Sequence, residues 1–216
     1  MPFFAEHREF FTQFRERFES TGAVAPSSRF LARAMTGPLS RHAGPVRVLE
    51  VGPGTGAVTR KIVTLLGPEA RFDLVELNDK FADLLQRKFE SEPSYQRVAD
   101  QSHIHRCPIQ DFATDEPYDF IISGLPLNNF PADLVREIFD VLFRRLAPGG
   151  VLSYFEYMYV RPLRRMVSRG AERQRLRELD EIIRMHLSHH RLRRDWVFVN
   201  LPPAWVQHLR PNPALV

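Results

Sequence analysis

The sequence predicts an α/β fold, in which a mostly parallel β-sheet is covered by helices and closed by an antiparallel hairpin. Apolar β-like runs alternate with amphipathic helical runs from about Val46 to Glu156, as is typical of a parallel sheet with helices on both faces. Beyond this region, two short β-like runs flank a proline pair. The 216 residues, 44% of them hydrophobic, suit one globular domain with a short extension. We therefore expect a domain at residues 21–216 and a separate segment at residues 1–20.

The expected elements alternate regularly along the chain. Strands are expected at residues 46–52, 71–77, 102–107, 118–123 and 150–158, and helices at residues 56–66, 79–91 and 132–146. Pro131 suits the start of the third helix, and residues 147–150, Ala-Pro-Gly-Gly, are expected to end it before the fifth strand. An arginine-rich segment at residues 161–194 follows, helical as far as residue 187. Residues 195–200 and 204–209 then form the closing hairpin.

A glycine-rich turn follows the first expected strand. Residues 46–59 read VRVLEVGPGTGAVT and place Gly52, Gly54 and Gly56 at alternate positions. Glycine has no Cβ, so the backbone can approach a ligand closely. The motif lacks the further glycine of the dinucleotide fingerprint, which favours S-adenosylmethionine over NAD because no pyrophosphate needs to be held. The alternative is a tight connection that binds nothing.

An acidic residue ends the second expected strand. Glu76 follows the glycines by roughly 20 residues, where a carboxylate can accept hydrogen bonds from both hydroxyls of a ribose. A nucleoside-bearing cofactor is therefore expected at the carboxyl edge of the sheet. A parallel sheet finished by a hairpin is also typical of the Rossmann-like, class I S-adenosylmethionine-dependent methyltransferases.

Composition narrows the setting. The single cysteine, Cys107, excludes an intramolecular disulfide and a cysteine-based zinc site, and it suits the cytoplasm. No apolar run reaches the length of a membrane span. The formal charge is +4, the pI is about 9.6, and nearly all bases are arginine, which grips phosphate through a planar fork of donors. An anionic partner is therefore expected, either acidic lipid or nucleic acid.

Two segments could meet a membrane surface. The first is the expected helix at residues 1–20, whose apolar stripe lies within an arc of about 120° and holds Phe3, Phe4, His7, Phe10, Phe11, Phe14 and Phe18. It suits a membrane interface, or it packs on the domain or on a dimer partner. The second is the arginine-rich segment, which would dock on an anionic membrane and a lipid phosphate or form a solvated helix face. Within it, His186, His189 and His190 lack the acids or cysteines of a metal site, so no metal is expected.

Two further motifs carry a family resemblance. Residues 22–35 read GAVAPSSRFLARAM, and residues 121–131 read IISGLPLNNFP. Together with the glycine turn, they resemble the bacterial phospholipid N-methyltransferases of the soluble-fold type, across most of residues 20–160. The resemblance implies methylation of phosphatidylethanolamine towards phosphatidylcholine by a cytoplasmic enzyme peripherally associated with the membrane. Related enzymes include the ribosomal RNA adenine dimethylases.

The departures from the RNA-modifying pattern favour a lipid substrate. Methylation of adenine N6 needs an amide that accepts from the exocyclic amine and an aromatic ring that stacks on the flipped base. Gly124 stands where that asparagine would be, and Leu127 replaces the aromatic residue. Nucleic acid is therefore not expected. RNA adenine N6-methylation, and a non-catalytic membrane or assembly protein with the same fold, remain the alternative hypotheses.

The resemblance also implies the cofactor site. Glu76 would hold the ribose, the three glycines the methionine part, and Ile109 the adenine. An aspartate that contacts the adenine amine in relatives is Pro108 here, and Asp111 could substitute for it. Glu50 would order the loop or contact the methionine amine. The full set expected to bind the cofactor is Ser28, Glu50, Gly52, Gly54, Gly56, Glu76, Leu77, Ile109 and Ser123.

The methyl acceptor is expected beyond the fourth strand. Backbone groups of Ser123 and Gly124 would shape its slot, and Tyr157 would offer a π surface to a methylated ammonium. Tyr154 is expected in the core. The histidines His42, His103 and His105 are conceivable bases, but no general base is assigned.

Overall fold

The computed structural model describes residues 28–158, 169–200 and 202–211. The helix expected at residues 1–20, Tyr159 and the first part of the arginine-rich segment lie outside these ranges. The side chains of Ser28 and Ala171 are likewise not described.

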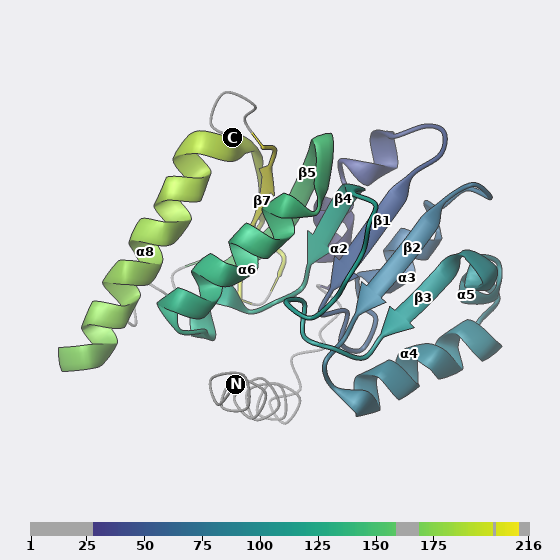
Figure 1. The fold of residues 1–216 in the computed structure, drawn as a ribbon, viewed down its shortest axis with the longest axis horizontal. Coiled ribbons are helices and arrows are strands. Elements are labelled where there is room, and N and C mark those ends of the chain that lie inside the picture. Colours follow the sequence, from purple (N-terminus) through teal and green to yellow (C-terminus); the bar gives the residue numbers. More distant parts are fainter. Residues whose placement is uncertain (1–27, 159–168, 201, 212–216) are drawn as a thin grey trace.

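The described residues form one seven-stranded sheet with the order β3-β2-β1-β4-β5-β7-β6 (Figure 1). Its strands are β1 (Arg47–Val51), β2 (Arg71–Val75), β3 (Ser102–His105), β4 (Tyr118–Ser123), β5 (Leu146–Tyr157), β6 (Arg191–Val197) and β7 (Ala204–Leu209). The first five strands are parallel, whereas β7 pairs antiparallel with both β5 and β6. The predicted parallel sheet with a closing hairpin is confirmed.

Helices cover both faces of the sheet. The described helices are α2 (Ser28–Met35), α3 (Thr59–Val63), α4 (Asp79–Ser91), α5 (Pro93–Gln96), α6 (Ala132–Arg144) and α8 (Gly170–His190), with 3-10 turns η1 (Leu39–Arg41), η2 (Ala99–Gln101) and η3 (Leu127–Asn129). Strand residues alternate between two cores: Leu49 packs with α6 and α8, and Val48 packs with α2, α3 and α4. In Figure 1, α6 runs in front of the sheet and α8 lies at its β6–β7 end. No helix in these ranges is long and apolar enough to cross a bilayer.

Most predicted boundaries are close to the observed ones. Helix α4 occupies the predicted residues, and Asn78 begins it by accepting a hydrogen bond from the Lys80 N–H at 2.9 Å. Helix α6 ends at Arg144 and α3 is shorter than predicted. Strand β6 lies four residues earlier than predicted at its start, because α8 ends at His190 and the chain enters the strand directly.

One predicted break was wrong. Residues 147–150 were expected to separate helix and strand, but they belong to β5, which begins at Leu146. The register there is irregular: Tyr118 pairs with Leu146, and Phe120 pairs with Val151. Gly149 has a φ of 81°, and a Cβ on Gly150 would lie 2.9 Å from the carbonyl oxygens of both Ala147 and Tyr118. The glycines therefore allow a bulge inside the strand rather than a loop before it.

A polar cluster ties three strands together. The Tyr118 hydroxyl donates to Asp73 Oδ2 at 2.9 Å, and His105 Nε2 lies 2.6 Å from Asp73 Oδ1. Burial raises the pKa of Asp73, but the hydrogen bonds from His105 and Tyr118 outweigh it and leave the pKa below the usual value. His105 therefore links β2 and β3 rather than serving as a free base.

His186 holds α8 against α6 without any hydrogen bond to its ring. It is buried, its ring stacks on Phe139 and Phe143 with centroids 4.4 and 5.3 Å away, and neither ring nitrogen has a partner. Burial chiefly, then His190 and His189, lower the pKa of His186 to about 4, against a smaller opposite effect of Asp140. His186 is therefore part of the core.

Through His186, the unchanged protein should have a lower free energy of unfolding at pH 5 than at pH 7.5. We expect the His186→Leu variant to lack most of this difference. The folded-state pKa is about 4 and the ordinary value is 6.5, so the unfolded chain binds the proton first. The stability contribution is therefore complete above pH 6.5 and falls as the pH drops towards 4, by up to roughly 3 kcal/mol. Urea unfolding at both pH values measures it. The exposed His189→Gln is the control, and an unchanged pH dependence in His186→Leu would contradict the prediction.

Candidate functional site

A cleft opens at the carboxyl ends of β1 and β2. It encloses about 460 Å³ up to the open solvent and is lined by residues 51–52, 75–78, 107–110 and Leu125. The lining of the cleft is largely apolar, as is typical of small-molecule sites. Of the residues predicted to bind a cofactor, Gly52, Glu76, Leu77 and Ile109 line this cleft.

Glu76 joins the two chain segments that border the cleft. Its carboxylate is buried, with Oε2 accepting from the Gly54 N–H and Oε1 from the Asn78 N–H, both at 2.9 Å. A carboxylate oxygen can accept more than one hydrogen bond. Gly54 is thus connected to the cleft lining by its hydrogen bond to Glu76. The same carboxylate holds the loop and lies where a ribose is expected to bind.

The three glycines of the turn share a left-handed backbone conformation but have different surroundings. Gly52, Gly54 and Gly56 have φ values of 69°, 57° and 83°, a conformation that other residues rarely adopt. A Cβ on Gly56 would lie 3.1 Å from both Leu85 Cδ2 and Tyr95 Oη. Gly56 therefore packs against α4 and α5, outside the cleft lining, and supports the loop from behind.

Glu50 also lies behind the loop. It is buried within β1, between its partners Leu74 and Ile122. Burial chiefly, and then the nearby Glu50 carboxylate, raise the pKa of Tyr95, whose hydroxyl donates to Gly56 O at 3.3 Å. Glu50 is not among the residues that line the cleft, and its ordering of the loop stays a prediction.

The end of β4 is closed by a backbone contact. The Gly124 N–H donates to Val51 O at 2.8 Å, and a Cβ on Gly124 would lie 2.6 Å from Gly52 O. Any larger residue at position 124 would collide with the cofactor loop. The glycine found in place of asparagine is therefore a steric requirement of this turn, and the neighbouring Leu127 is buried and offers no face for stacking.

Ser123 and Asn128 flank this turn. Ser123 is fully buried, and its Oγ accepts from the Leu125 N–H at 3.4 Å, so its hydroxyl supports the turn. Asn128, in η3, is 7% exposed, and its amide oxygen has no hydrogen-bond partner. Asn128 lies within the motif of residues 121–131, but it is not among the residues predicted to form the site. The sequence feature that could have identified Asn128 is its position as a polar residue directly after the turn on the substrate side.

The part of the cleft after β3, where adenine is expected to bind, differs from the sequence prediction at Asp111. Pro108 and Gln110 line it, whereas the exposed Asp111 does not. Within residues 107–110, Gln110 is therefore the lining residue that carries an amide. Cys107 also lines the cleft, and burial raises the pKa of its thiol.

Several predicted residues are not brought into the cleft. Tyr157 ends β5, and its ring packs edge-on against Phe155, with centroids 5.2 Å apart, on the α2 face of the sheet. Ser28 is the first residue of α2. Tyr154 is fully buried in the core, as expected. His103 is exposed on β3, and His42 lies edge-on to Phe120, with ring centroids 5.5 Å apart. Among the described residues, no cluster of histidines, cysteines and acids could hold a metal.

Comparison with known proteins agrees with this geometry. A family model described as a methyltransferase domain matches residues 48–150. The ornithine lipid N-methyltransferase of Singulisphaera acidiphila is 30% identical over 149 residues, which cover 69% of this chain and 77% of that protein. The ribosomal RNA small subunit methyltransferase A of Dehalococcoides mccartyi is 34% identical over 79 residues, which are 37% of this chain and 25% of that protein.

Solved structures share the fold. The N-methyltransferase NodS from Bradyrhizobium japonicum WM9, in complex with S-adenosyl-L-homocysteine, has a TM-score of 0.63 at 21% identity, covering 88% of this chain and 89% of that one. The glycopeptide N-methyltransferase MtfA has a TM-score of 0.61 at 13% identity, with 84% and 87% covered. At these identities, the likeness concerns the fold alone.

We expect Gly124→Ala to destabilise the protein by roughly 1–3 kcal/mol, because its Cβ would be forced against the Gly52 carbonyl oxygen. Chemical unfolding of both proteins measures the difference. Gly67→Ala is the matched control, since a Cβ there has no atom within 4 Å and the backbone needs no left-handed conformation. Equal stability of the two alanine variants would show that the β4 turn moves away at no cost.

Proposed function

Since this chain belongs to the class I S-adenosylmethionine-dependent methyltransferases, we propose that it methylates the primary amine of a membrane-lipid headgroup. The proposed substrate is phosphatidylethanolamine, converted towards phosphatidylcholine at a membrane surface. The observation that carries this proposal is the Gly124–Gly52 contact, which leaves no room for the amide that adenine methylation requires. A lipid amine needs no amide at position 124 and no stacking ring.

The described cleft fits S-adenosylmethionine. The buried Glu76 carboxylate, which accepts from the Gly54 and Asn78 N–H groups, is proposed to accept from the ribose hydroxyls as well. Leu77 and Ile109 supply apolar surface for adenine, and Gln110 supplies an amide for its amine. The bare backbone of Gly52 and Gly54 suits the methionine part. When bound, the cofactor supplies an electrophilic methyl group on a sulfonium centre.

The residues after β4 are proposed to position the acceptor. The headgroup amine must be neutral, with its lone pair directed at the methyl group. The unpartnered amide oxygen of Asn128 is suited to accept an N–H from that amine and so to set its orientation. The backbone of Ser123 and Gly124 is proposed to shape the slot for the headgroup. Positioning and exclusion of water then supply most of the rate.

A second candidate substrate is an ornithine lipid. The similar protein of Singulisphaera acidiphila carries that activity in its name, and it aligns over most of both chains. Both candidate lipids present a primary amine. RNA stays the weaker alternative, because the matching ribosomal RNA enzyme aligns over only 37% of this chain and its chemistry would need the excluded amide.

A transfer assay separates these candidates. The protein is incubated with methyl-labelled S-adenosylmethionine and either phosphatidylethanolamine vesicles, ornithine-lipid vesicles, amine-free phosphatidylglycerol vesicles or ribosomal RNA. We expect label in phosphatidylethanolamine and none in phosphatidylglycerol or RNA. Label in ornithine lipid alone would reassign the substrate, and label in RNA alone would overturn the lipid proposal.

Replacing Glu76 tests the cofactor assignment. In Glu76→Gln, one acceptor oxygen becomes a donor, which opposes both the backbone N–H and the ribose hydroxyl it should receive. We expect the affinity for S-adenosylhomocysteine to fall at least about tenfold, or 1.4 kcal/mol, by titration calorimetry. The exposed Glu69→Gln is the control. Unchanged binding in a folded Glu76→Gln protein would place the ribose elsewhere.

Replacing Asn128 tests the acceptor assignment. We expect Asn128→Leu to lower methyl transfer by roughly ten- to a hundredfold while S-adenosylhomocysteine affinity is kept. Stability should stay equal or rise, because the variant removes a buried acceptor whose lack of a partner costs about 1–3 kcal/mol. Initial rates, calorimetry and urea unfolding measure the three quantities. A loss of stability with normal transfer would make Asn128 structural.

A further inference from the structure

Exposed apolar side chains gather on one strand and the turn that follows it. Within the described ranges, the large exposed hydrophobic residues outside this region are Phe30 and Met185. The others are Leu192, Trp196, Phe198 and Val199, with exposed fractions of 51, 54, 64 and 63%. Strand β6 lies at the edge of the sheet that the described residues form, so no described strand pairs with its outer side. We call Trp196, Phe198 and Val199 the aromatic tip.

Ring contacts hold the aromatic side chains of the tip in place. The rings of Trp196 and Phe198 stack with centroids 5.6 Å apart, and Trp196 meets Trp205 of β7 edge-on at 5.8 Å. The Arg194 guanidinium lies 5.1 Å from the centre of the Trp205 ring. Such an arrangement costs little further ordering on binding. Trp and Arg together are also typical of surfaces where apolar and charged environments meet.

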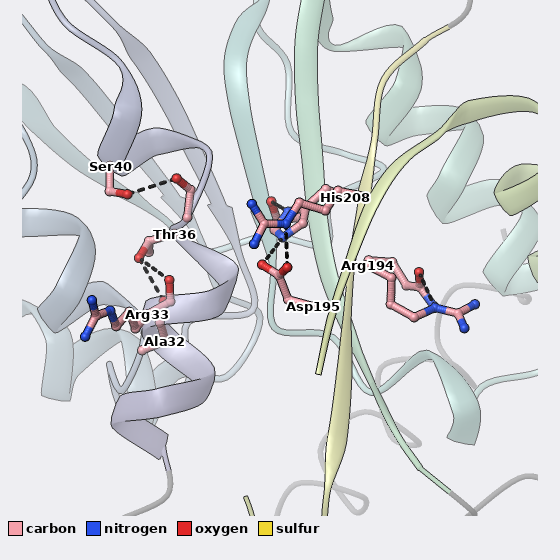
Figure 2. A network of polar contacts seen from close by, with 11 residues as sticks. Ala32, Arg33, Thr36, Ser40, Arg194, Asp195 and His208 are labelled. Atoms are coloured by element: carbon pink, nitrogen blue, oxygen red, sulfur yellow. Dashed lines mark hydrogen bonds and ion pairs between the residues drawn. The ribbon is translucent and has the colours of Figure 1, made fainter. Parts of the chain in front are cut away.

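Positive charge lies directly beside the aromatic tip. Arg184 of α8 and Arg191 and Arg194 of β6 line an open groove of about 740 Å³, which also contains Ser188 and one acid, Asp180. Figure 2 shows Arg194 on the opposite side of β6 from Asp195 and His208. Arg194 is held by Gln207 Oε1 at 3.3 Å. Asp195 does not line the groove and is engaged by Arg193 at 2.5 Å. With three arginines and one acid in its lining, the groove has an excess of positive charge.

The sheet register places the aromatic tip at the edge that carries the cofactor cleft. Trp196 pairs with Trp205, and Trp205 pairs with Glu156 near the carboxyl end of β5. The cleft lies at the carboxyl ends of the parallel strands β1 and β2. A flat partner that contacts the tip would therefore face the same edge of the sheet that receives the methyl acceptor.

We propose that the aromatic tip and the arginine groove form a docking surface for an anionic phospholipid bilayer. The tip enters the headgroup region, where tryptophan is favoured, and the groove arginines hold lipid phosphates. This proposal rests on the proposed function, since it explains how a lipid amine reaches the cleft. A second copy suits the surface less well. Two-fold antiparallel pairing of β6 edges would bring the arginines of both copies close together.

Vesicle co-sedimentation tests the surface on the full chain. We expect binding to vesicles of phosphatidylcholine with phosphatidylglycerol, and weak binding to phosphatidylcholine alone. The double variant Trp196→Ala/Phe198→Ala should bind the anionic vesicles about tenfold more weakly. Arg184→Gln and Arg191→Gln should each weaken binding about fivefold, and salt should mask their effect. The double variant Phe30→Ala/Met185→Ala removes exposed apolar groups elsewhere and should bind normally.

Tryptophan fluorescence gives an independent readout, because the chain contains only Trp196 and Trp205. We expect a blue shift on anionic vesicles in Trp205→Phe, where Trp196 remains, and a much smaller shift in Trp196→Phe. Normal vesicle binding by Trp196→Ala/Phe198→Ala, or the absence of a shift from Trp196, would overturn the docking surface. A change in oligomeric state of that variant, with vesicle binding intact, would assign the tip to a second copy.

The failure of docking and that of the proposed function are distinguishable. With a short-chain, monomeric phosphatidylethanolamine, the variant Trp196→Ala/Phe198→Ala should methylate as fast as the unchanged protein, and only the rate on vesicles should fall. Equal losses on both substrates would contradict a docking role. Vesicle binding without methylation of any lipid by the unchanged protein would overturn the proposed function and leave the surface standing.

Discussion

The site depends on the close approach of two backbone turns at the carboxyl edge of the sheet. The turn after β4 comes so near the turn after β1 that a Cβ on Gly124 would lie 2.6 Å from the Gly52 carbonyl oxygen. The Gly124 N–H also binds the last carbonyl of β1. One contact therefore fixes where a cofactor loop and an acceptor loop meet. It also excludes a side-chain amide from the position where base-methylating relatives use one.

Around this contact, the structure divides the work between polar and apolar groups. Glu76 clamps the glycine loop to the end of β2 through two backbone N–H groups, while Gly56 and Tyr95 brace the loop from the opposite side. The cleft between them is mainly apolar, so electrostatic interactions inside it are poorly screened. A cationic sulfonium, one buried carboxylate and a neutral amine form a consistent set for such a site.

The β6–β7 hairpin at one edge of the sheet is proposed to have a different role. Strands β6 and β7 add nothing to the cofactor cleft, but they carry the aromatic tip and the arginine groove on the lipid-facing edge that we propose. An enzyme whose substrate stays in a bilayer must bind the surface as well as the headgroup. In this proposal, the hairpin orients the enzyme on the membrane, and the parallel strands carry the site of methyl transfer.

The sequence alone determined the features that arise from local patterns. Apolar periodicity placed α4 and the parallel strands, the proline pair placed the hairpin, and the glycine spacing with Glu76 located the cofactor edge. Only the tertiary structure decided which side chains meet across distant segments. It buried His186 between α6 and α8, placed Gln110 rather than Asp111 in the cleft lining, left the amide oxygen of Asn128 without a hydrogen-bond partner and packed Tyr157 on the α2 face of the sheet. Such outcomes depend on strand order, register and steric contact between segments far apart in the chain, which no local pattern encodes.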